Sequence, residues 1–260
     1  MNRTDLERLK AWFSGYSRSF AAAAGEDPRP YAVKEEHTRK VCENILLVAE
    51  SLGLDKGRSA AAEAVALFHD VGRFPQYRQY KTFRDSVSVN HAALSAKVLV
   101  EERVLAELPA EEQKVITGAV TLHNVLALPE GLDDETALFT KLIRDADKLD
   151  IWRVFGEYYR LPEDERSAVI GLALPETPGY SAEVLACLSS GEMVKHAMVH
   201  TQNDFKLLQL SWVYDLHFPR SFRIMSERGY IDGIAAALPQ TDEVKGAVDG
   251  VKAYVERMKG

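Results

Sequence analysis

Residues 59–74 read SAAAEAVALFHDVGRF, and this stretch decides the fold that we predict. Its first ten residues are alanine-rich and nearly all apolar, which predicts a buried helix that ends at the following glycine. His69 and Asp70 therefore stand at the end of a buried helix, where both side chains can turn toward one point. Because an unpaired buried carboxylate is very costly, Asp70 needs a cation beside it. Arg73 could supply that charge, and so could a divalent metal, which would also give His69 a role as a ligand.

Helical periodicity continues on both sides of this stretch. Val41, Ile45 and Val48 recur at helical spacing, and Asn90 is a good N-cap for a helix that runs to Val100. Further helices are predicted after Pro109, over about 135–152, over 204–228 with an interruption near Pro219, and over 242–259. No alternating pattern predicts a strand, so the expected fold class is all-α.

We predict one all-α domain over residues 1–260. Residues 20–30 (FAAAAGEDPRP) are expected to link an N-terminal helix to the main body. Residues 161–180 contain several prolines and are expected to form a loop with one short helix. The C-terminal part, about 156–260, would shape either a pocket or a dimer interface, so a homodimer is compatible with the sequence.

Composition excludes several classes of protein. Of 260 residues, 46% are hydrophobic and 27% charged, which is typical of a soluble globular chain and not of a disordered one or a coiled-coil rod. No apolar run is long enough to span a membrane, and the first residues do not read as a secretory signal. The net charge of −7 argues against duplex nucleic acid as a partner. Two cysteines, Cys42 and Cys187, make no disulfide framework, so we expect a reduced, cytoplasmic protein.

Histidines carry the chemical signal of this sequence. His37, His69, His91 and His123 fall in four separate predicted helices or helix ends, each beside apolar residues. An acidic cluster follows in RDADKLDIW at 144–152. There Asp147 and Asp150 share a helix face, whereas Asp145 points roughly the other way. A solvated face with ion pairs would also explain the cluster, but its apolar neighbours require part of it to face the core.

In this order the residues resemble the HD superfamily of metal-dependent phosphohydrolases, whose motif is H…HD…D on consecutive core helices. The resemblance covers a core of about 30–155 and rests on HDVGRFPQYRQYKTF, SVNHAALSAKVL and RDADKLDIW. It implies an HD-domain helical bundle with additional C-terminal helices.

The resemblance also implies a set of metal ligands. His37, His69, Asp70 and Asp147 would bind a first ion, with Asp145 as the competitor of Asp147. Two further histidines, His91 and His123, match those of dinuclear members, in which the HD aspartate bridges two ions. The expected cofactor is therefore one or two divalent ions, of Mn, Mg, Ni, Co or Fe.

The function that the resemblance implies is hydrolysis of a small phosphate ester, such as a nucleotide, by metal-activated water. Asp70 would be central to catalysis, and Arg73 and Lys148 would offset the charge that develops on the phosphoryl oxygens. Many members have lysine where this chain has Arg73, which keeps the charge but cannot donate a proton. Two alternatives stay open: a di-iron oxygenase of the HD type and a non-catalytic metal-binding or sensor domain.

The segment after the HD pair is rich in aromatic and basic residues. Tyr77, Arg78, Tyr80, Lys81, Phe83 and Arg84 are expected in a loop broken by glycine and proline. The aromatic side chains of such a loop could pack against the core and hold the loop in place. It could equally act as a lid over the metal pocket, in which Arg78 or Lys81 meets an anionic substrate.

Overall fold

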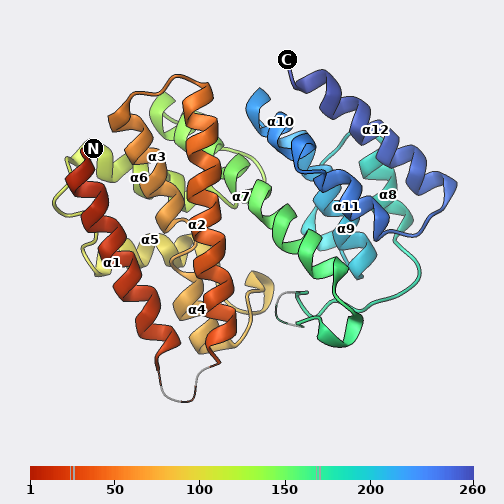
Figure 1. Cartoon of the computed structure of the whole chain (residues 1–260), viewed down its shortest axis with the longest axis horizontal. Helices are drawn as coiled ribbons and strands as arrows, with labels where there is room; N and C mark the ends of the chain where they lie inside the picture. Colours follow the sequence, from red (N-terminus) through yellow and green to blue (C-terminus); the bar gives the residue numbers. More distant parts are fainter. Residues whose placement is uncertain (24, 26, 168, 170) are drawn as a thin grey trace. The chain divides into compact units, whose positions relative to one another are not determined.

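The computed structural model covers residues 1–260 and describes all of them except 24, 26, 168 and 170. Throughout the described residues, every regular element is helical (Figure 1), which confirms the predicted all-α class. The chain divides into two compact units, Met1–Asp150 and Ile151–Gly260. That these units fold as one cooperative domain stays a prediction.

The first unit is a bundle of helices around α3. Its elements are α1 (Arg3–Ala21), α2 (Pro28–Ser51), α3 (Lys56–Phe68), α4 (Arg73–Tyr80), η1 (Asp85–Val87), α5 (His91–Glu101), α6 (Ala110–Leu122) and the first part of α7 (Asp134–Arg160). The alanine-rich α3 packs against α1, α2 and α6. Small side chains allow this close packing, and from Ala64 to Phe68 every residue of the helix is buried. The HD pair therefore begins where the most enclosed helix of the unit ends.

Local sequence explains where these helices begin. The side chain of Asp55 accepts a hydrogen bond from the backbone N–H of Arg58 at the start of α3. Asn90 does the same for α5, accepting from the backbone N–H of Ala93, as its sequence predicts. The cap at Asn90 fixes His91 as the first residue of α5.

Two expectations for the first unit need correction. The segment after the HD pair is not a loop throughout, because Tyr77, Arg78 and Tyr80 lie on α4. Pro75 is tolerated in the first turn of that helix, where no intrahelical N–H bond is required. The linker that was expected over residues 20–30 is shorter in the structure, because α1 continues to Ala21 and α2 begins at Pro28. Part of the linker, at 24 and 26, lies outside the described residues.

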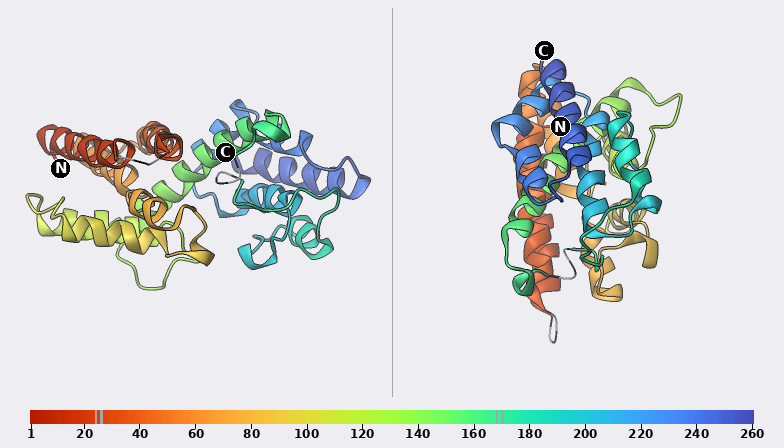
Figure 2. Two further views of the ribbon diagram at one scale, coloured as in Figure 1. Left: turned by 90° about the horizontal axis from the view of Figure 1, so that it is seen from below. Right: turned by 90° about the vertical axis from the view of Figure 1, so that its right-hand side faces the viewer.

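The second unit consists of the rest of α7 and a set of shorter helices, seen from two further directions in Figure 2. They are η2 (Glu163–Glu165), α8 (Ala182–Ser189), η3 (His196–Met198), α9 (Gln202–Ser211), η4 (Trp212–Asp215), α10 (Pro219–Glu227), α11 (Tyr230–Ala236) and α12 (Asp242–Met258). Every residue of α9 is buried, so this helix forms the centre of the unit.

The helix expected over 204–228 is divided in the structure. It breaks between Asp215 and Pro219, because proline lacks the N–H that would continue the first helix and instead opens α10. The region 161–180 contains the short helix η2, as expected, although 168 and 170 lie outside the described part. Both cysteines are free thiols. None of the described helices is apolar over a length that would cross a bilayer.

Candidate metal centre

Four histidine rings meet inside the first unit, each delivered by a different helix. His37 lies on α2, His69 caps the end of α3, His91 opens α5 and His123 caps the end of α6. All four are buried. The Nε2 atoms of His37 and His69 lie 3.3 Å apart, and those of His91 and His123 lie 3.0 Å apart. The rings thus form two pairs.

Hydrogen bonds that Nδ1 donates set the orientation of every ring. The Nδ1 atoms of His69 and His123 lie 2.7 and 2.8 Å from the carbonyl oxygens of Ala66 and Val120, three residues earlier in the chain. A carbonyl only accepts, so Nδ1 carries the hydrogen in both rings. Their Nε2 atoms then offer lone pairs, as metal-ligating histidines do.

Carboxylates orient the other two rings. Nδ1 of His37 donates to Oδ2 of Asp150 at 2.7 Å, and Nδ1 of His91 donates to Oδ2 of Asp85 at 2.6 Å. A carboxylate on the outer nitrogen fixes the tautomer and makes the inner nitrogen a stronger ligand. The four Nε2 atoms therefore lie in two pairs, and each pair forms a group of possible metal donors with Asp70.

Asp70 lies between the two pairs of rings. Its Oδ2 is 3.6 Å from Nε2 of His37 and 3.7 Å from Nε2 of His69, and its Oδ1 is 3.4 Å from Nε2 of His91. Two sets of donors result, and the atoms of each set are close enough to share one ion. We name them the first group (His37, His69 and Asp70) and the second group (Asp70, His91 and His123).

Asp147 completes the first group. Its Oδ1 lies 3.1 Å from Nε2 of His37 and 3.6 Å from Nε2 of His69, and this buried oxygen has no hydrogen-bond partner in the described structure. Asp145, two residues earlier, is buried on roughly the opposite side of α7. A carboxylate oxygen and two ring nitrogens that face one another at these distances need a shared cation, either a proton or a metal.

The electrostatics of the site agree with this interpretation. Burial would raise the pKa of Asp70 and of Asp147, but nearby cationic and histidine groups hold both well below the usual value, so both stay ionised. Burial lowers the pKa of His91, and the positive charge of Arg73 adds to this effect. Burial and the neighbouring histidine rings lower the pKa of His123 to about 3. Burial and Lys34 also act to lower the pKa of His37, but Asp147 and Asp150 outweigh them and raise it to about 9.

Neutral imidazoles and ionised carboxylates are the donors that divalent transition metals take. The residues present therefore fit one ion in the first group and a second ion in the second group. The raised pKa of His37 shows that Asp147 and Asp150 make the first group the more favourable position for a positive charge.

Two cations flank Asp70. Nζ of Lys34 lies 2.7 Å from Oδ2, and Nε of Arg73 lies 3.3 Å from Oδ1. Arg73 Nη1 also donates to Oε1 of Gln76, to the Phe83 carbonyl and to Oδ1 of Asp85, at 2.8, 2.6 and 2.9 Å. Two side chains of the protein itself, Lys34 and Arg73, therefore supply the positive charge that the sequence predicts beside Asp70.

Lys148 is placed differently from Arg73. Its Nζ donates to the carbonyl of Arg144 at 3.3 Å, one turn back on α7. As the neighbour of Asp147 it projects about 100° away around the helix. Its predicted role toward phosphate stays a prediction.

Sequence reasoning missed three residues of the site: Lys34, Asp85 and Asp150. Signals existed for two of them, since Lys34 precedes His37 by three residues and Asp150 follows Asp147 by three, spacings that put each pair on one helix face. Asp85 lies on the three-residue helix η1 between α4 and α5, where no periodicity predicts its contact with His91.

Comparison with known families agrees with the geometry. Residues 35–152 match the HD domain family. The chain carries an HD domain. The matched segment contains the five histidines and aspartates of the first and second groups and also Asp147, and HD domains are typical of metal-dependent hydrolases. No curated protein and no solved structure showed a significant match to the chain.

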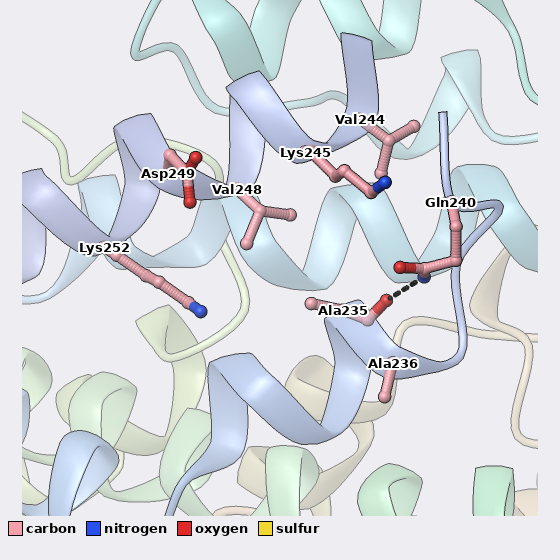
Figure 3. A pocket seen from close by; sticks show the side chains of 8 residues that line it. All are labelled: Ala235, Ala236, Gln240, Val244, Lys245, Val248, Asp249 and Lys252. Atoms are coloured by element: carbon pink, nitrogen blue, oxygen red, sulfur yellow. Dashed lines mark hydrogen bonds between the residues drawn. The ribbon is translucent and has the colours of Figure 1, made fainter. Parts of the chain in front are cut away.

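The second unit offers a pocket of another kind. It has a volume of about 290 Å³ and lies between α11 and α12 (Figure 3), lined by Ala235, Ala236, Gln240, Val244, Lys245, Val248, Asp249 and Lys252. Lys252 forms an ion pair with Asp232, and both side chains are largely exposed. This pocket lacks the buried, convergent donors of the HD domain, so we place the candidate site in the first unit.

Proposed function

We propose that this protein is a metal-dependent phosphohydrolase that hydrolyses a small phosphate ester. One observation carries the proposal: two sets of nitrogen and oxygen donors share the carboxylate of Asp70, and cationic side chains stand beside it. An arrangement of this kind suits an anionic substrate bound next to divalent metal.

Each donor has a role in the proposed reaction. His37, His69, Asp70 and Asp147 would hold the first ion, and His91 and His123 would hold a second ion together with Asp70. Divalent ions held there would supply activated water and Lewis-acid stabilisation of the phosphoryl oxygens.

The chain itself contributes preorganisation. Asp150 and Asp85 hold the rings of His37 and His91 in the orientation that turns Nε2 inward. Because these carboxylates already hold the rings in place, the rings need not reorient during the reaction. Electrostatic catalysis depends on such preorganised groups. Arg73 keeps a fixed positive charge beside Asp70, where it would oppose the negative charge that builds up on the transferred phosphoryl group.

Elemental analysis tests the proposal first. The protein is purified without added metal or chelator, metal is counted per chain, and release of inorganic phosphate from a panel of phosphate esters is then measured. One or two ions of manganese, nickel, cobalt or magnesium together with phosphate release would support it. Two irons per chain with oxygen-dependent turnover would establish the oxygenase alternative instead. Absence of metal, with none regained on reconstitution, would refute both.

A further inference from the structure

Lys34 occupies an unusual position for a lysine. It lies on α2, one turn before His37, and its side chain is only 17% exposed. Nζ is 2.7 Å from Oδ2 of Asp70, the oxygen that belongs to the first group of donors. The ammonium group is thus held at the edge of the metal centre, on a side chain that keeps a small exposed fraction.

The two cations beside Asp70 differ in how firmly they are held. Three acceptors besides Asp70 fix the guanidinium of Arg73, and they come from α4 and from the segment that follows it. Lys34, in contrast, contacts Asp70 and lies over the ring of Phe83, 5.3 Å from its centre. An ammonium group has three N–H donors. Two of those on Lys34 have no acceptor within the described parts of the chain.

The environment of Lys34 favours an anion. Arg73 lies over the same Phe83 ring, 6.0 Å from its centre, so two positive charges share one side of the site. Asp70 is the carboxylate that both of them contact, and it must also serve as a ligand if metal binds. Because the lysine stem is flexible, Nζ can turn from Asp70 to a phosphate oxygen without any movement of the backbone.

We propose that Lys34 is a substrate-binding residue whose ammonium group binds the phosphate of the substrate beside Asp70. Arg73 serves mainly as the fixed partner of Asp70 and Asp85. This inference rests on the proposed function, since it takes the ligand to be a phosphate ester.

Binding of inorganic phosphate tests the role of Lys34 directly. Calorimetry on the metal-loaded protein would compare wild type with Lys34→Gln, Lys34→Arg and Lys40→Gln. Lys40 is the matched control, because it lies on the same helix but pairs with Glu43 at the surface. Metal content per chain is counted in each variant, and KM and kcat are measured with any ester that the wild type hydrolyses.

We expect Lys34→Gln to weaken phosphate binding about 10- to 100-fold, the contribution of a hydrogen bond to a charged group. Metal content should be unchanged, and KM should rise more than kcat falls, because the lost contact binds the ground state as well as the transition state. Lys34→Arg should retain most of the affinity, and Lys40→Gln should bind phosphate like the wild type.

Two results would overturn the role of Lys34. Unchanged phosphate affinity in Lys34→Gln would show that the ammonium does not bind the ligand, and loss of metal in that variant would show that Lys34 only supports Asp70. Failure of the proposed function looks different: a protein that binds phosphate through Lys34 but hydrolyses no ester would contradict the reaction and leave the binding role in place.

Discussion

The two groups of donors around Asp70 are built on the same plan but supported differently. In each, one ring is fixed by a backbone carbonyl three residues earlier and the other by a carboxylate. The first group relies on Asp150, whose side chain is 1% exposed on the long helix α7. The second relies on Asp85, which is 29% exposed and lies on the short helix η1.

The two groups also differ in charge. The first has Asp147 in addition to its share of Asp70, whereas the second, within the described residues, has neutral rings and Asp70 alone. More anionic ligands on a more rigid support bind a divalent ion more tightly. We therefore expect the first group to bind its ion more strongly and the second to bind the more exchangeable ion.

Asp70→Ala should have the largest effect, because it removes the carboxylate that both groups share. We expect metal content to fall to none or nearly none per chain, and ester hydrolysis to fall by more than about 100-fold, above the range that outer partners contribute. Elemental analysis and phosphate release check this. A variant with full metal content and full turnover would contradict the assignment of the centre.

Replacing one histidine in each pair should show which ion each group binds. In His91→Ala the second ion should be lost and the first retained, whereas in His37→Ala the tighter ion should be lost. Metal titration, followed by competition with a chelator, measures the number of ions and the affinity of each. Unchanged stoichiometry in His91→Ala would refute a second ion.

Gly72→Ala should destabilise the unit through α5, the helix that carries His91. A Cβ atom at position 72 would lie 2.5 Å from the backbone nitrogen of Ser95 and 2.6 Å from the backbone oxygen of His91, contacts that require the helix to move. Overpacking against backbone should cost about 3 kcal/mol, or roughly 10 °C in Tm.

Gly15→Ala is the control for that variant. Gly15 is exposed on α1, where an added Cβ meets nothing within 4 Å, so alanine should stabilise the helix by about 0.5–1 kcal/mol. Thermal unfolding measures both changes. An equal effect of the two substitutions would show that close approach of α5 does not require glycine at position 72.

The comparison of the two groups also shows which parts of the site can be predicted from the sequence. Helical spacing predicted that the four histidines lie on separate helices or helix ends and that Asp147 shares a face with Asp150, whereas the grouping of these residues as ligands came from the resemblance to the HD superfamily. Asp85 and the ion pair of Lys34 with Asp70 depend on chain segments that only folding brings together. Helix α4 was missed for a local reason, since Pro75 reads as a breaker unless its place in the first turn is known.

Asp85→Asn and Asp150→Asn test the supports themselves, and their effects should be the smallest. Each substitution keeps the size of the side chain but removes the charge that orients one ring, so we expect a 10- to 100-fold loss of affinity for one ion only. Asp85→Asn should weaken the second ion, and Asp150→Asn the first, as read from the same metal titrations. Asp85 also accepts hydrogen bonds from Arg73 and Gln76, so its substitution should loosen the segment after α4, which hydrogen exchange can detect. If Asp85→Asn weakened both ions equally, the two groups would behave as one site, because a support that contacts His91 alone among the rings should not reach the first group.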